Sequence, residues 1–159
     1  MSLSPETIAF LKTTPLFVAV PAERLPEIVA AGEEVTFQAG DALIRQDALT
    51  DYLYVVVNGR VAIEIEGVSK VGERGPRSIL GELAMISRSP RNANCTAVTA
   101  IKAVQFKHDQ FWPFVEQEPQ LAIGLLSEVI YHLDETIDAM NRLSKEVREL
   151  RGALDKLKR

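Results

Sequence analysis

The chain has 159 residues, 47% of them hydrophobic, and a formal net charge of −4. Its length fits one domain with an extension and is enough to bury a core, while no apolar run approaches the roughly eighteen residues of a membrane span. The first residues lack the basic and apolar segments of a secretion signal, and the single cysteine cannot form an internal disulfide, so we expect a cytoplasmic protein.

The N-terminal third predicts two helices. Ser4 is placed to cap the first, with Pro5 at its first helical position and the helix running through Leu11. A second helix is expected from about Ala22, with Gly32 as its stop.

From residue 34 the apolar pattern changes to that of strands. Val35 and Phe37 alternate with polar neighbours, and a turn at Gly40 and Asp41 starts the next strand. Asn58-Gly59 predicts a tight hairpin turn. Many short strands bounded by turns indicate a β-roll or barrel. The further strands are expected at residues 53–57, 61–65, 70–73, 94–100 and 102–106.

Residues 81–93 carry the most specific chemistry. Gly81 opens a short helical turn, whose N–H groups and dipole favour an anion, and Arg91 can close on that anion with its planar fork of donors. Glu82 would repel a plain phosphate. A ligand with a phosphate at one end and hydroxyl groups at the other resolves the conflict, and a nucleotide with a free ribose hydroxyl fits. The alternative is an ordinary strand–turn–helix with a surface arginine.

The two halves of this segment, Gly81-Glu82-Leu83-Ala84 and Pro90-Arg91-Asn92-Ala93, resemble the phosphate-binding cassette of the cyclic nucleotide-binding domain family. Residues 40–46 and 51–61 look like the first half of the same β-roll, so the resemblance covers about the first 140 residues. It implies a mainly β fold with flanking helices, in which a jelly-roll-like β-roll is followed by a long C-terminal helix. Asp47 and Arg77 depart from the family, whose members often have turn glycines at these places.

The resemblance also implies roles for the cassette residues. In the family, the residue at Glu82 bonds the ribose 2′-hydroxyl, the residue at Arg91 pairs with the cyclic phosphate, and backbone amides around Ala84 and Asn92 complete the phosphate site. Members that prefer cyclic GMP commonly carry threonine in place of Asn92, so cyclic AMP is favoured here, with cyclic GMP as the alternative and no cofactor. Arg88 either assists or is a solvated loop residue. The expected cassette ligands are Gly81, Glu82, Leu83, Ala84, Arg91, Asn92 and Ala93.

The last third predicts one long helix from Pro119, which we treat as a second domain (119–159) after the roll (1–118). Two sets of positions repeat every seven residues, and nine of the ten are apolar, as in a coiled-coil seam. A parallel homodimer is expected, and the alternative is a helix folded back on its own roll. The seam consists of Leu126, Leu133, Met140, Val147 and Leu154, followed three residues later by Val129, Thr136, Leu143, Leu150 and Leu157.

Thr136 is the polar exception in this seam. The helix resembles the central helix of the catabolite activator family of cyclic AMP-responsive regulators, in which a threonine at the matching position reaches the adenine amino group. A hydroxyl can both donate and accept, so we add Thr136 to the ligand set. The alternative is a bond back to its own helix. Ile137 is apolar where the family has a second hydroxyl from the partner subunit.

The remaining features point away from other functions. Residues 142–159 carry a net charge of +4, which suits nucleic acid, an anionic membrane or the solvated flank of a coiled coil. The activator family places its DNA-binding domain directly after this helix, where the chain ends, so we expect no DNA binding by this chain alone. His108 and His132 lie outside the roll, and neither a metal site nor a catalytic arrangement is recognisable. Cys95 is a buried hydrophobe or a reactive thiol.

Together these patterns predict a non-enzymatic regulatory domain. It would bind a cyclic nucleotide and transmit binding through a dimeric C-terminal helix to an unknown output domain or protein. The alternative is a structural dimerisation module whose anion pocket is empty or takes another ligand.

Overall fold

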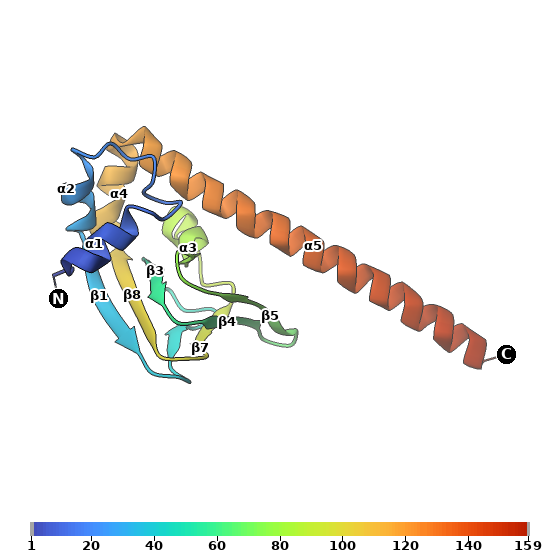
Figure 1. The fold of residues 1–159 in the computed structure, drawn as a ribbon. Coiled ribbons are helices and arrows are strands. Elements are labelled where there is room, and N and C mark those ends of the chain that lie inside the picture. Colours follow the sequence, from blue (N-terminus) through green and yellow to red (C-terminus); the bar gives the residue numbers. More distant parts are fainter. Residues whose placement is uncertain (1, 159) are drawn as a thin grey trace. The chain divides into compact units, whose positions relative to one another are not determined.

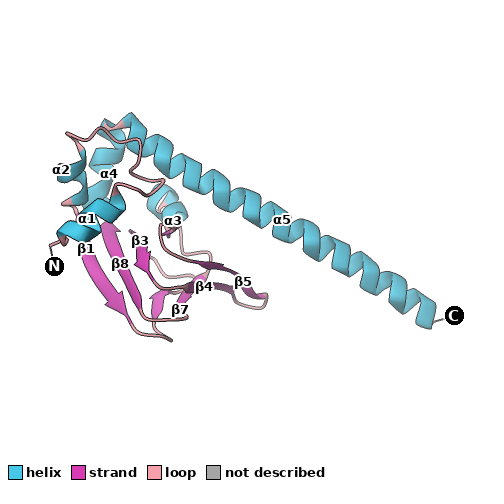
Figure 2. Cartoon of the chain, in the orientation of Figure 1, coloured by secondary structure: helices cyan, strands magenta, loops and turns pink. Residues whose placement is uncertain are grey.

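The computed structural model describes residues 2–158. The chain divides into two compact units, Met1–Glu128 and Val129–Arg159. Our boundary between residues 118 and 119 stays a prediction, although the last helix does begin at Pro119. In chain order (Figures 1 and 2) the elements are α1 (Pro5–Leu11), α2 (Leu25–Val29), β1 (Gly32–Phe37), β2 (Ala42–Ile44), β3 (Tyr52–Asn58), β4 (Val61–Ile65), β5 (Ser69–Arg74), β6 (Ile79–Leu80), α3 (Glu82–Ser87), β7 (Asn94–Ala97), β8 (Ile101–Lys107), α4 (His108–Gln117) and α5 (Pro119–Leu157).

The first unit is a β-roll of two four-stranded antiparallel sheets. One sheet has the strand order β1-β8-β3-β6 and the other β2-β7-β4-β5. Mostly short connections, one of them containing α3, carry the chain between the sheets, and among the described strands β4 and β5 are the only consecutive pair that lies side by side in a sheet. The predicted fold class, a β-roll with flanking helices followed by a long helix, is confirmed.

The central strand β3 is buried on both faces because each face packs against a different hydrophobic core. Leu53 and Val55 point to a core shared with α1, α2, α4 and the first turns of α5. Tyr54 and Val56 point to a second core between the two sheets. A strand covered on both faces reads as a continuous apolar run, which is why residues 53–57 show no alternation. Figure 1 shows α1, α2 and α4 gathered at one end of the roll.

The hairpin predicted at Asn58-Gly59 is wrong. β3 and β4 follow one another in sequence but belong to different sheets, so the pair turns the chain across the roll and does not join two paired strands. Gly59 does have a positive φ of 95°, as a glycine in such a turn allows, and a Cβ there would collide with the carbonyl oxygen of Ala100. The local turn chemistry was therefore correct, whereas the pairing depended on distant strands.

The helix ends are confirmed in part. Ser4 caps α1, and its hydroxyl accepts a hydrogen bond from the amide of Thr7 at 3.1 Å. The second helix is shorter than predicted, and Gly32 is not its stop but the first residue of β1, paired with Phe106. A Cβ at Gly32 would lie only 2.8 Å from the Phe106 ring, so the glycine is needed for close packing.

Helix α5 changes character along its length. Leu121, Gly124 and Leu125 in its first turns are buried in the core of the roll. From Leu126 onward the large apolar side chains other than Val129 are about half exposed or more. Within the described chain, even this longest helix lacks the uninterrupted apolar stretch that crossing a bilayer requires.

Candidate functional site

The candidate site is the cassette, residues 81–93, which begins where β6 ends. β6 pairs with β3 through Leu80 and Tyr54, so the sheet fixes the position of the next residue, Gly81. Gly81 has φ 87° and ψ 16°, a left-handed conformation that turns the strand directly into α3. Its carbonyl accepts the first helical hydrogen bond, from the amide of Met85 at 3.2 Å. The amides that come before Met85 in α3 therefore have no acceptor within the helix and can donate to an anion.

Arg91 lies beneath this turn and is held by three hydrogen bonds. Its Nη1 donates to the carbonyl of Gly81 at 2.9 Å, its Nε to the hydroxyl of Thr50 at 2.8 Å, and its Nη2 to the carbonyl of Tyr52. The guanidinium also lies 5.2 Å from the centre of the Tyr52 ring, within range of a cation–π contact. These bonds use three of the five N–H groups, so Nη1 and Nη2 each carry one more donor.

Burial makes this arginine unusual. Only 3% of Arg91 is exposed, and desolvation lowers the pKa of its guanidinium, an effect that Tyr52, Cys95, Tyr54 and Glu82 partly offset. A buried positive charge is costly unless it is hydrogen-bonded and balanced by negative charge. Carbonyl and hydroxyl oxygens supply only partial charges, so an anion brought to this fork gains more than it would at a solvated arginine.

Glu82 is the second buried charged residue of the cassette, with 7% exposure. It occupies the first turn of α3, where a carboxylate is stabilised by the helix dipole. The structure therefore brings three predicted residues together: Gly81 contacts Arg91, and Glu82 acts on the Arg91 charge. The others flank them: Ala84 is buried, Ala93 is half-buried, and Leu83 and Asn92 are exposed.

Sequence reasoning missed Thr50 and Tyr52, which hold Arg91 in place. They lie in the loop before β3 and at its first residue, about forty positions from the arginine. Arg91 is tied to the same loop through its main chain, because its amide donates to the Ala48 carbonyl at 3.0 Å and its carbonyl accepts from the Asp47 amide at 2.8 Å. No local pattern signals these contacts, since they depend on how the roll folds.

Cys95 is a buried side chain of the inter-sheet core. Burial, with a smaller contribution from the Glu82 carboxylate, raises the pKa of its thiol to about 12. The thiolate is the reactive form, so the structure favours the hydrophobe over the reactive thiol.

Three non-glycine residues adopt the left-handed conformation around the roll. Asp47, Arg77 and Arg88 have φ values of 66°, 76° and 55°. Asp47 and Arg77 stand where the family often has turn glycines. Both adopt the left-handed conformation that a glycine favours, so the turns keep their backbone shape without the glycine. Each such residue costs about 1 kcal/mol relative to glycine.

Thr136 lies in the second unit, and its hydroxyl donates to the carbonyl of His132 at 2.9 Å. This bond back to its own helix is the alternative named from the sequence. It uses the hydroxyl proton and leaves the oxygen able to accept, so a contact with an adenine amino group stays a prediction. Within residues 2–158, no group of three His, Cys, Asp or Glu side chains is placed to hold a metal ion.

A family profile covers the roll and the cassette. The profile of the cyclic nucleotide-binding domain matches residues 34–118. The chain belongs to the cyclic nucleotide-binding domain family. The cassette lies within the matched residues.

Relatives cover different parts of this cyclic nucleotide-binding domain. A cAMP-dependent protein kinase regulatory subunit from Dictyostelium discoideum is 31% identical over 86 residues, which is 50% of this chain and 26% of the relative. The N-terminal domain of a transcriptional regulator from Streptomyces coelicolor A3(2) is 33% identical, with a TM-score of 0.63 over 82% of this chain and 94% of that one. The catabolite activator protein of Thermus thermophilus, at 20% identity, shares the fold, with a TM-score of 0.71 over 82% and 63%. The chain spans about a quarter to two thirds of the first curated relatives it matches.

Proposed function

We propose that this domain is a cyclic AMP receptor that dimerises through α5 and transmits ligand binding to an output domain or partner protein. The observation that carries the proposal is Arg91, buried with its fork directed at the Gly81 turn beside the buried Glu82. A cyclic nucleotide matches the chemistry of both groups. Its phosphate gives Arg91 a full negative charge, and its 2′-hydroxyl gives Glu82 a donor in place of a second anion.

Several features favour cyclic AMP as the ligand. The kinase regulatory subunit that the chain resembles is named for cyclic AMP. Asn92 stands where members selective for cyclic GMP commonly have threonine. The Thr136 hydroxyl donates to its own helix, so its oxygen can accept a hydrogen bond from the adenine amino group. In this proposal Gly81, Leu83, Ala84 and Ala93 supply backbone contacts, and the domain performs no catalysis.

The exposed side of α5 supports the dimer. Its seam residues carry exposures such as 55% at Leu133, 64% at Met140 and 70% at Leu150 in the single chain. Large apolar residues repeated over five heptads would stay in water without a partner. A parallel second copy buries them and pairs Glu146 with Arg151 of that copy. Ligand binding then shifts the dimer between two arrangements by no more than its difference in affinity for them.

Calorimetry with modified nucleotides tests the ligand assignment. The wild type is expected to bind cyclic AMP in the micromolar range, or about −8 kcal/mol, and 2′-deoxy cyclic AMP about tenfold to a hundredfold more weakly. Glu82→Gln keeps the side-chain size but removes the charge, so it should lose a similar factor for cyclic AMP and almost nothing more for the deoxy ligand. Cyclic GMP and linear AMP serve as comparison ligands.

Two results would contradict the assignment. Absence of binding by the wild type would leave a dimerisation module with an empty or different anion site. Equal losses for both ligands in Glu82→Gln would separate the carboxylate from the 2′-hydroxyl.

Sedimentation tests the dimer. We expect the wild type to sediment as a dimer at micromolar concentration, and Leu143→Glu to weaken the dimer by about a hundredfold or more, because an unpaired charge in the seam costs about 3 kcal/mol. Lys145→Glu, on the helix face opposite the seam, is the matched control and should remain dimeric. A monomeric wild type would rule out the coiled coil.

A further inference from the structure

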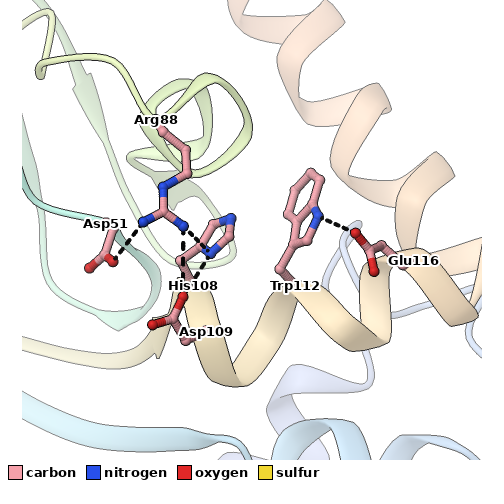
Figure 3. A network of polar contacts seen from close by, with 6 residues as sticks. All are labelled: Asp51, Arg88, His108, Asp109, Trp112 and Glu116. Carbon is pink, nitrogen blue, oxygen red and sulfur yellow. Dashed lines mark hydrogen bonds and ion pairs between the residues drawn. The ribbon is translucent and has the colours of Figure 1, made fainter.

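Arg88 connects the cassette to the next helix. It ends α3 in a left-handed conformation, and its amide donates to the Ala84 carbonyl at 2.9 Å. Its side chain extends to the beginning of α4, where Nη1 lies 2.8 Å from Nδ1 of His108 and 3.7 Å from a carboxylate oxygen of Asp109. Nη2 lies 3.8 Å from the carboxylate of Asp51 (Figure 3). One side chain therefore contacts α4 and the loop that holds Arg91.

Residues 50–52, at the end of the loop before β3 and the first position of that strand, contact both arginines. Thr50 and Tyr52 bind Arg91, whereas Asp51 between them faces Arg88. The carbonyl of Asp51 also accepts a hydrogen bond from the amide of His108 at 2.8 Å. A shift of Arg91 toward an anion would loosen its bonds to both this loop and the Gly81 turn. The change would reach Arg88 from two sides, through Asp51 and through the short α3.

Arg88 has a left-handed backbone, which bears on the role of its side chain. Glycine adopts this conformation with less strain, so an arginine at this position makes the folded protein less stable than a glycine would. The Arg88 side chain is 53% exposed, and ion pairs at such exposure add little to folding. Its partner His108 is better buried, with 13% of its side chain exposed, and makes a short hydrogen bond to it. The arrangement is therefore better suited to tying two elements together than to stabilising the fold.

We propose that Arg88 is a positioning residue that passes the ligand state of the cassette to α4, through His108. This inference rests on the proposed function, since it needs a ligand that draws Arg91 away from its present carbonyl partners. α4 runs from His108 to Gln117 and is followed after Glu118 by α5, so a shift at the start of α4 can pass along this helix to the C-terminal helix.

Trp112 provides the readout. It is the only tryptophan in the chain, and its ring stacks on His108 with 5.3 Å between ring centres and 11° between planes. Its indole N–H donates to Glu116 at 2.9 Å, which holds the ring against the helix (Figure 3). Movement of the Arg88–His108 pair would change the surroundings of the indole and hence its fluorescence.

The test compares ligand binding and tryptophan emission in three proteins. In the wild type, saturating cyclic AMP should shift the Trp112 emission and the amide resonances of residues 108–117. Arg88→Gly should bind cyclic AMP within about threefold of the wild type but lose most of both responses. Arg77→Gly is the matched control, since it also replaces an exposed left-handed arginine by glycine, and it should keep both responses in full.

The outcomes separate this inference from the proposed function. If Arg88→Gly binds cyclic AMP and its α4 signals respond as in the wild type, Arg88 does not transmit and only this inference fails. The same holds if the wild type binds but α4 gives no response. If calorimetry shows that the wild type binds no cyclic AMP, the proposed function fails, and the transmission through Arg88 fails with it.

Discussion

Replacing Arg91 with alanine is expected to abolish measurable cyclic AMP binding and to lower the free energy of unfolding by about 3 kcal/mol. Binding fails because the phosphate loses its only buried cationic partner in this site. Stability falls because the carbonyls of Gly81 and Tyr52 lose a charged donor in a place that the roll keeps from water. Calorimetry measures the first effect and denaturant unfolding the second.

The control for Arg91→Ala is Arg60→Ala, since Arg60 is more than half exposed and pairs with Glu73 at 3.6 Å. That variant should bind and unfold like the wild type, because exposed ion pairs contribute about 0–1 kcal/mol. Arg91→Lys separates charge from geometry, as it keeps the charge and loses the fork. A folded Arg91→Ala protein that binds cyclic AMP as tightly as the wild type would exclude the cassette as the phosphate site.

Gly124→Ala is expected to destabilise the protein by about 2 kcal/mol, against the usual sign for such a change in a helix. Alanine normally gains about 1 kcal/mol over glycine in a helix interior. At Gly124, however, a Cβ would lie 2.5 Å from the carbonyl oxygen of Leu16 and 3.1 Å from that of Pro15. Backbone atoms cannot rotate away as side chains do, so the first turns of α5 would be pushed off the core at a cost of about 3 kcal/mol.

Gly152→Ala is the matched control in the same helix. No atom lies within 4 Å of a Cβ at Gly152, so helix propensity alone operates and stability should stay equal or rise by up to about 1 kcal/mol. Thermal unfolding of both variants gives the comparison. A Gly124→Ala protein as stable as the wild type would show that α5 does not pack against Pro15 and Leu16 this closely.

The cassette could be recognised from sequence because its chemistry is local. Gly81, Glu82 and Arg91 lie within eleven residues, and a left-handed turn, a helix start and an arginine are features that each residue carries itself. The support beneath Arg91 could not be found in this way. Thr50 lies in a loop and Tyr52 at the first position of β3, and the antiparallel pairing of β3 with β6 places both near the Gly81 turn.

The same distinction explains the errors in the fold. The helix starts predicted at Ser4 and Pro119 were correct, because a helix start depends on a few adjacent residues. Asn58-Gly59 forms a turn, as expected. The strands on either side of it do not pair, because strand pairing depends on contacts across the whole roll. Gly32 resembled a helix stop because a glycine needed for close packing against Phe106 looks the same in sequence as one needed for a turn.

Arg91 takes part in the architecture as well as in the site. Its main chain and side chain together form hydrogen bonds with Asp47, Ala48, Thr50 and Tyr52. Arg91 therefore fixes the position of the loop before β3. A descendant of this domain that had lost its ligand would still be under selection to keep the arginine for folding. The arginine alone is therefore a poor marker of nucleotide binding in divergent relatives. Loss of the carboxylate at the position of Glu82 would be the better sign that such a domain no longer binds a cyclic nucleotide.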